Sequence, residues 1–175
     1  MNSSTENHEP VHSCEYKENL NILRQTYLFS KLPMEPLKVF AYLCTKEVYG
    51  AGDFLFRQGD EDGQALILLS GAARLIRENH HGECVFRDYA PQDFIGAMSL
   101  LGKTNRLYSL RALTDTTCLV LERERFARTL RQFPTIAPVV IQAIAEQVHA
   151  WEEKLLVQHA DHCEACKSIV GISLV

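Results

Sequence analysis

The stretch DGQALILLSGAARLIRENHHGE, residues 62–83, decides the fold class of this chain. It contains two apolar, β-branched runs of strand length, separated and followed by glycines. Similar runs lie after this stretch at 84–96 (CVFRDYAPQDFIG) and 108–123 (YSLRALTDTTCLVLER). Another lies before it at 47–59 (EVYGAGDFLFRQG). Short strands at a spacing of about ten residues indicate an antiparallel sandwich or barrel rather than alternating βα units. We therefore predict a mainly β protein that closes as a jelly-roll β-barrel.

Helical patterns flank this β-region on both sides. Before it, the apolar residues between Leu20 and Leu28 recur at helical spacing. Pro33 interrupts this pattern before a second short helix at 34–45. After it, a short helix ends near Pro134 and one long segment continues beyond Pro138. The expected organisation is a flexible arm at 1–18, a β-roll with N-terminal helices at 19–133, a long C-terminal helix at 134–162 and a short tail at 163–175.

The long C-terminal segment carries apolar residues at steps of three and four, which is the spacing of a heptad seam. These residues are Ile141, Ile144, Val148, Trp151 and Leu155. The seam either packs on the β-domain of its own chain or pairs with a second copy. A helix of this length outreaches a small sandwich, so we expect a homodimer with these five residues at its interface.

Composition excludes several classes of partner. The chain has 175 residues, with 18 basic and 22 acidic ones and a net charge of -4, so no global positive field favours nucleic acid or anionic membranes. The polar N-terminus lacks a signal-peptide core, and no apolar run reaches membrane-spanning length, which predicts a cytoplasmic protein. The six scattered cysteines fit reduced thiols, and the apolar surroundings of Cys44 and Cys118 place these two in the core.

A ladder of turn residues resembles a known family. It consists of Gly52-Asp53, Phe56-Arg57-Gln58-Gly59-Asp60, Leu69-Ser70-Gly71, Asp93-Phe94-Ile95-Gly96, Arg106 and Ala112. Together with the order of helices and strands, it resembles the cyclic-nucleotide-binding domain of the catabolite activator and fumarate-nitrate regulator (CRP/FNR) family over roughly residues 25–160. The resemblance implies a ligand-sensing domain that acts in signal transduction and dimerises through its long helix.

The resemblance also places a phosphate cassette, which comprises Gly96, Ala97, Met98, Ser99, Arg106 and Leu107. In the family, backbone N–H groups of the glycine turn and the arginine hold the cyclic phosphate of a small anionic ligand. A glutamate follows the glycine and binds the ribose hydroxyl, but this chain has Ala97 there, and Leu107 adds bulk beside the arginine. We therefore expect weak or altered ligand binding. Arg106 has two other readings, a solvated strand residue or a partner of Asp93 or Glu83.

A second candidate site lies at the C-terminal end of the long helix. His159, His162, Cys163 and Cys166 would share one helix face if the helix continued, and two thiolates with two imidazoles suit zinc. The alternative is a polar helix end with spare cysteines. Sister branches of the family bind haem, an iron–sulfur cluster or a small acid, so a metal, iron or haem sensor is the second hypothesis for function.

The sequence indicates a non-enzyme. A cupin-type metal enzyme needs about three ligands from inward-facing strand positions, whereas the β-region offers only the adjacent pair His80 and His81, which fits a hairpin tip. The residues after the long helix are too few for the winged helix that the family appends. We expect no direct DNA binding by this chain, either as a natural stand-alone sensor or as a truncated regulator.

Overall fold

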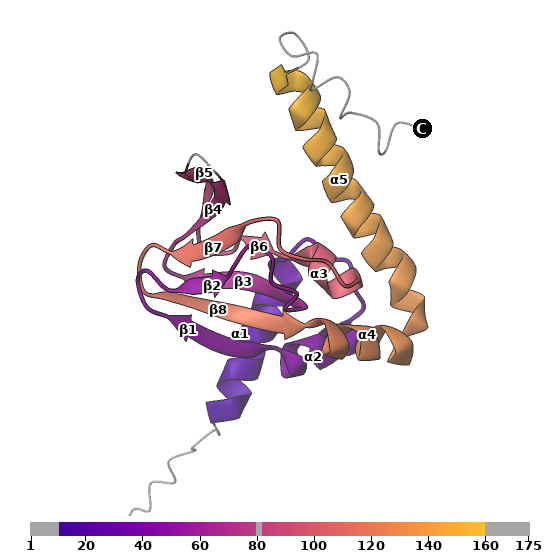
Figure 1. Ribbon diagram of the computed structural model, residues 1–175. Helices are drawn as coiled ribbons and strands as arrows, with labels where there is room; N and C mark the ends of the chain where they lie inside the picture. The colour runs from indigo at the N-terminus through magenta and orange to yellow at the C-terminus, as the bar shows by residue number, and fades with distance from the viewer. Residues whose placement is uncertain (1–10, 80–81, 160–175) are drawn as a thin grey trace, which may run out of the picture.

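The computed structural model describes residues 11–79 and 82–159 (Figure 1). Helices flank a β-roll on both sides in sequence. In chain order, the elements are α1 (Val11–Gln25), α2 (Met34–Leu43), β1 (Thr45–Tyr49), β2 (Phe54–Phe56), β3 (Gln64–Ser70), β4 (Ala73–Asn79), β5 (Gly82–Tyr89), β6 (Phe94–Ile95), α3 (Ala97–Leu101), β7 (Ser109–Ala112), β8 (Thr116–Glu122), α4 (Arg123–Gln132), the 3₁₀ helix η1 (Pro134–Ile136) and α5 (Ala137–His159).

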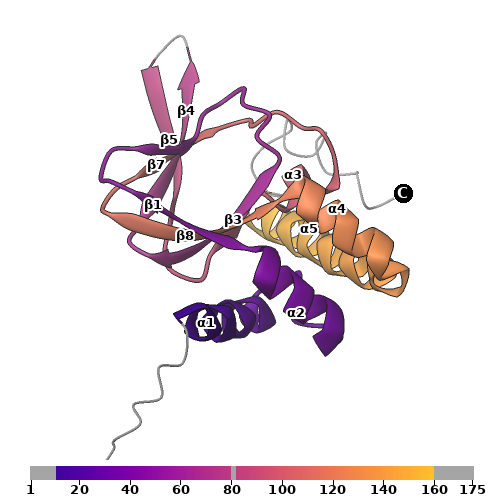
Figure 2. The ribbon, with the colours of Figure 1, turned by 90° about the horizontal axis from the view of Figure 1, so that it is seen from below.

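The described strands form two four-stranded sheets, with the orders β1-β8-β3-β6 and β2-β7-β4-β5. All strand pairs are antiparallel. Seen from below, the strands surround a common interior (Figure 2), and an apolar cluster that includes Leu66, Leu68, Leu110 and Val120 fills it. The predicted jelly roll is confirmed.

The centre of the first sheet explains the unbroken apolar run of the opening stretch. The side chains of β3 point alternately to the two faces of the sheet. Leu66 and Leu68 face the interior of the roll, whereas Ala65 and Ile67 belong to a second core beneath the helices. Because both faces of this strand are covered, all four residues are buried. β5 is an edge strand, and its residues 82–88 are exposed.

The second core joins α1, α2 and α4 to the outer face of the first sheet. Phe29, Phe40 and Phe126 lie at its centre, each 0% exposed, with ring centroids 5.2 and 5.4 Å apart along this series. Figure 2 shows α1 and α2 side by side below the roll. The interruption predicted at Pro33 is observed, because α2 begins at Met34 directly after this proline.

Two of the predicted boundaries require correction. Helix α1 begins at Val11, so the arm predicted for residues 1–18 is too long. Residues 11–18 form the first turns of a helix that Tyr16, Leu20 and Leu23 anchor to the core. The helix predicted for 134–162 divides at its start, because Pro134–Ile136 form a separate 3₁₀ turn before α5 begins at Ala137. Residues 160–162 and the tail lie outside the described residues.

The turn between β5 and β6 contains a backbone conformation that suits glycine. Gln92 has φ of 79° and is the one non-glycine residue with positive φ in the described part of the chain. Its turn has Pro91 before it and is closed by a hydrogen bond from the Asp93 N–H to the Ala90 carbonyl, 3.1 Å long. This arrangement corresponds to a type II turn, in which glycine is preferred at the position of Gln92.

We predict that Gln92→Gly raises the free energy of unfolding. The left-handed conformation costs an L-residue about 1–2 kcal/mol, and the extra chain entropy of glycine offsets about 0.5–1 kcal/mol of this gain. The expected net stabilisation is therefore roughly 0.5–1 kcal/mol, measurable as a higher urea midpoint with an unchanged slope. Gln58→Gly, in an exposed turn without positive φ, is the matched control and should not stabilise the protein. Equal gains in both variants would contradict the strain argument.

The cysteines of the β-roll differ in accessibility, which predicts their reactivity. Cys44 and Cys118 are buried, and burial raises the pKa of each thiol to about 12. At pH 8 only about one such thiol in ten thousand is the reactive thiolate. We expect N-ethylmaleimide to label the exposed Cys84 and to spare Cys44 and Cys118, as peptide mapping by mass spectrometry would show. Labelling of all three in concentrated guanidinium chloride is the control, and rapid native labelling of Cys118 would refute the expectation.

Candidate functional site

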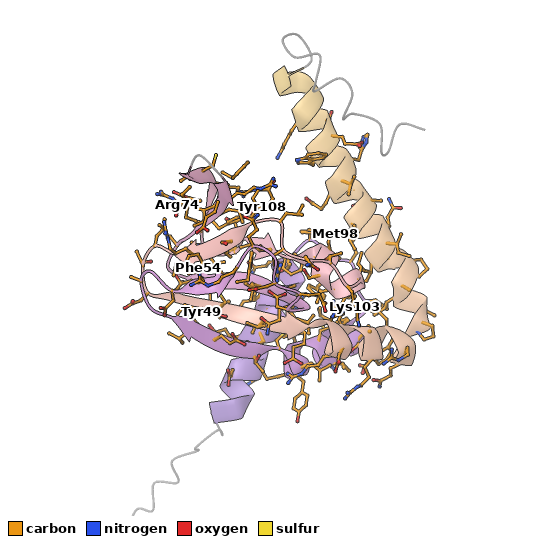
Figure 3. All side chains as sticks on the ribbon, viewed as in Figure 1. Tyr49, Phe54, Arg74, Met98, Lys103 and Tyr108 are labelled. Carbon is orange, nitrogen blue, oxygen red and sulfur yellow. The ribbon has the colours of Figure 1, made fainter. Side chains whose placement is uncertain are left out.

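A cavity of about 920 Å³ opens between the mouth of the β-roll, α3 and the side of α5. Its walls come from both sheets, from the segment between α3 and β7, and from one residue of α5. They are Tyr27, Phe56, Leu75, Tyr89, Phe94, Ile95, Gly96, Ala97, Met98, Ser99, Thr104, Asn105, Arg106, Leu107, Tyr108 and Trp151. All six residues of the predicted cassette line this cavity. Figure 3 shows Met98 and Tyr108 on the part of the roll that lies toward α5.

Gly96 forms the turn that leads from β6 into α3, and its backbone adopts a conformation that favours glycine. Its φ is 89°, which is in the left-handed region. A side chain here would also collide, because an added Cβ would lie 2.6 Å from Arg106 Nη1 and 2.8 Å from the Gln64 carbonyl oxygen. The glycine therefore allows the backbone to approach the arginine closely.

The short helix after this turn offers little to an anion. α3 has five residues, and the Ser99 N–H already donates to the Gly96 carbonyl at 3.0 Å. Ala97 has no polar side-chain atom, and Met98 is 57% exposed. The absence of a carboxylate at Ala97, which the sequence indicated, is therefore not compensated by another acidic side chain among the residues that line the cavity.

Arg106 lies at the base of the cavity and is already bound by the protein. Its Nε donates to Asp62 Oδ2 at 2.9 Å, and its Nη2 donates to Asp62 Oδ1 at 2.8 Å and to the Gln64 carbonyl at 2.6 Å. The guanidinium carbon lies 4.0 Å from the centre of the Phe56 ring. Only 8% of Arg106 is exposed. This is a forked, charge-assisted pair in a partly buried site.

The two other readings of Arg106 are wrong. It is not a solvated strand residue, since it is buried and precedes β7. Nor does it pair with Asp93 or Glu83, because Asp93 pairs with Arg87 at 3.3 Å and Glu83 with Arg111 at 2.9 Å. Sequence reasoning missed Asp62. The acidic run DEDG marks a turn beside the glycine ladder, but nothing in its spacing shows which of its carboxylates meets an arginine 44 positions later.

Leu107 and Trp151 extend the apolar wall of the cavity toward solvent. Leu107 is 69% exposed and Trp151 is 55% exposed. The helical spacing of Trp151 predicts an interface residue of the long helix. The structure also places Trp151 on the cavity wall, which helical periodicity alone does not reveal. Burial also raises the pKa values of Tyr27 and Tyr89, so both phenols on the wall are neutral.

The predicted seam of α5 occupies two environments in this chain. Ile144 packs partly against the helical core near Val140 and Ala143, while Ile141 is 64% exposed. Val148 is half-buried, and Leu155 lies within the helix. Intramolecular packing therefore covers the start of the helix and, farther along, Val148 in part and Glu152, which is 3% exposed.

The predicted metal site cannot be placed. His159 is the last described residue of α5, and His162, Cys163 and Cys166 lie outside the described residues, as do His80 and His81. Within the described ranges, no group of three or more His, Cys, Asp or Glu side chains is arranged to hold a metal ion.

Comparisons with known proteins agree with this architecture. The family model described as "Cyclic nucleotide-binding domain" matches residues 46–133. The cyclic AMP receptor protein of Thermus thermophilus is 33% identical over 123 residues, which are 69% of this chain and 56% of that protein. A solved structure of a cyclic nucleotide-binding-like protein from Brucella abortus has a TM-score of 0.60 and 30% identity, covering 65% of this chain and 98% of that one.

Larger proteins also share this domain. cGMP-dependent protein kinase 2 of Mus musculus is 28% identical over 120 residues, which are 67% of this chain but only 16% of the kinase, so this chain spans a small part of that relative. The chain belongs to the cyclic nucleotide-binding domain family, as the glycine ladder predicted. It is a cyclic-nucleotide-binding-like regulatory domain that resembles those of CRP/FNR regulators. None of the described helices has the length and hydropathy that a membrane crossing requires.

Proposed function

We propose that this chain is a ligand-sensing regulatory domain with altered ligand specificity, and that its ligand occupies the cavity beside Arg106. One observation carries the proposal. The arginine that the family uses for the cyclic phosphate is here neutralised by Asp62 and held against Phe56. An incoming phosphate would have to compete with a carboxylate that is already bound in a forked geometry.

The missing carboxylate at Ala97 supports weak cyclic nucleotide binding independently. Without it, the ribose hydroxyl loses one charge-assisted hydrogen bond, which is worth about 1.5–3 kcal/mol or on the order of ten- to a hundredfold in affinity. The exposed Leu107 adds apolar bulk at the same wall. The absence of a carboxylate at Ala97 weakens binding of the ribose, and the bulk of Leu107 hinders approach of the phosphate to Arg106. Because they act on different parts of the nucleotide, the two losses of binding free energy should add.

Binding rather than catalysis suits the chemistry of this cavity. The side chains that line it include no histidine, cysteine or carboxylate, so it offers neither an imidazole or carboxylate general base nor a set of metal ligands. This supports a non-enzyme and disfavours the cupin-like alternative. A sensor that uses metal, iron or haem through His159, His162, Cys163 and Cys166 stays a prediction, as does the expectation that this chain does not contact DNA.

The long helix suggests how a bound ligand would be read out. Trp151 of α5 lines the cavity, and Figure 1 shows α5 running past the roll and away from it. A ligand that touches Trp151 would bias the position of α5. We propose that α5 pairs with α5 of a second copy through Ile141, Ile144, Val148, Trp151 and Leu155, so that ligand binding alters the pairing and a downstream partner senses the change.

Cyclic nucleotides should bind weakly to the wild type, and two substitutions should restore binding. Asp62→Asn removes the competing charge from Arg106, and Ala97→Glu supplies the ribose acceptor. We expect calorimetry to show no submicromolar binding of cyclic AMP or cyclic GMP to the wild type. The double variant should bind at least about tenfold more tightly.

The matched control is Asp60→Asn with Ala97→Glu. Asp60 lies on the same turn, and its side chain accepts a hydrogen bond from the Arg57 N–H rather than contacting Arg106. This control should gain less than the Asp62 variant. A submicromolar dissociation constant for the wild type that survives Arg106→Ala would contradict the proposed site. Thermal unfolding of each variant confirms that it is folded before binding is interpreted.

Dimerisation predicts a simple sedimentation result. The wild type should sediment at twice its chain mass of 19.9 kDa, and Val148→Glu with Leu155→Glu should give monomers, because two carboxylates would be desolvated in an apolar seam. His149→Glu with Gln142→Glu is the control, since both residues are exposed and lie off the seam. A wild type that is monomeric at micromolar concentration would refute this arrangement.

A further inference from the structure

The cavity contains only one group that is charged at neutral pH, and that charge is compensated. Of the residues that line it, Arg106 is the only acid or base apart from tyrosines. Asp62 lies behind the arginine and does not line the cavity. The pair is neutral as a unit, so an anion that enters loses its hydration without meeting a net positive charge.

The arginine still offers one hydrogen-bond donor. Nε and Nη2 are used by Asp62 and the Gln64 carbonyl, whereas Nη1 donates to no group in the described part of the protein. Nη1 lies beside the Gly96 turn, where an added Cβ would be 2.6 Å away. A donor of this kind, which remains open to the cavity, can bind a ligand with a hydrogen-bond acceptor.

The cavity wall includes six aromatic side chains, and the ring of Trp151 is the one available for stacking. Phe94 contacts Tyr27 and Phe29 edge to face, Tyr108 contacts Phe86, and the faces of Phe56 and Tyr89 are covered by arginines. No described ring or cation contacts Trp151, which is 55% exposed at the cavity. Flat indole faces stack well on planar molecules.

We infer that the cavity takes an uncharged, flat aromatic molecule with an oxygen acceptor, which packs against Trp151 and accepts a hydrogen bond from Arg106 Nη1. This inference rests on the proposed function, because it names the ligand class of the same cavity. A volume of about 920 Å³ lies in the range of small-molecule sites. The neutral Arg106–Asp62 pair suits a carbonyl or amide oxygen better than a carboxylate or phosphate.

Two isosteric probes distinguish binding of an uncharged aromatic molecule from binding of an anion. 2-Naphthamide and 2-naphthoate share one ring system and one carbonyl oxygen, but the second is ionised at neutral pH. We expect calorimetry of the full chain to show at least tenfold tighter binding of the amide. Trp151 is the only tryptophan of the chain, so its emission, corrected for probe absorbance, should report binding at this cavity.

Substitution of Asp62 should remove the preference for the amide. Asp62→Asn leaves the Arg106 charge uncompensated and should strengthen naphthoate binding at least tenfold, with little change for the amide. Asp60→Asn, which makes the same change of charge on the same turn, should leave both affinities near those of the wild type. Trp151→Ala should weaken both probes by calorimetry, which does not depend on the fluorophore, while sedimentation shows that this variant, which also changes a residue of the proposed seam, keeps the oligomeric state of the wild type.

The outcomes distinguish this inference from the function on which it rests. Naphthoate binding that equals or exceeds amide binding in the wild type, with a response of Trp151, would overturn the inference and leave the cavity as a ligand site. Amide binding that is unaffected by Trp151→Ala would also overturn it, because the ring would then lie elsewhere. Absence of binding of either probe to wild type and Asp62→Asn alike would count against both proposals.

Discussion

Arg106 connects the segments that form the cavity. Its backbone N–H donates to the Asp60 carbonyl and its own carbonyl accepts from the Gly59 N–H, each at 2.8 Å. Its side chain then binds Asp62 and the Gln64 carbonyl at the start of β3. The turn between β2 and β3 is thereby tied to the segment before β7, and the Gly96 turn closes over the same guanidinium. Without Arg106, the turn between β2 and β3, the segment before β7 and the Gly96 turn would lose the side chain that they all contact.

A forked ion pair in this position contributes more to the specificity of the site than to stability. Burying both charges costs hydration, and the mutual attraction repays that cost only when the geometry is good, as it is here. Removing one partner is costly because the other is left buried and uncompensated. The pair therefore holds Arg106 in one orientation, with Nε and Nη2 turned toward the protein and Nη1 toward the cassette turn. An anionic ligand that binds Arg106 directly must meet the free-energy cost of reorienting this side chain away from Asp62.

The start of the long helix α5 is anchored in the helical core. Val140 and Ala143 are buried in the helical core, which fixes the direction in which the helix leaves the domain. Farther along, Trp151 lines the cavity and remains half-exposed, whereas Glu152 beside it is buried. The cavity therefore meets α5 at Trp151, well away from its anchored start.

Local pattern in the sequence was enough to predict the β-roll and the flanking helices, whereas the cassette at Gly96 came from the resemblance to the CRP/FNR family. Strand periodicity, the break at Pro33 and the glycines of the ladder are local signals, and Gly52, Gly59, Gly71 and Gly96 all have positive φ in the structure. The start of α1 was missed because its polar first turns have no apolar period of their own. The absence of a carboxylate at Ala97 was also readable directly from the chain.

Only the tertiary structure decided the partner of Arg106 and the surroundings of Trp151. Asp62 meets Arg106 because the antiparallel pairing of β2 with β7 brings two distant segments together, and the sequence contains several carboxylates that could have served equally well. Trp151 fits a helical seam by its spacing, but the direction in which α5 leaves the core also places it on the cavity wall. Such contacts depend on how elements pack in three dimensions, because spacing along a chain specifies the face of one element and not the neighbour that this face meets.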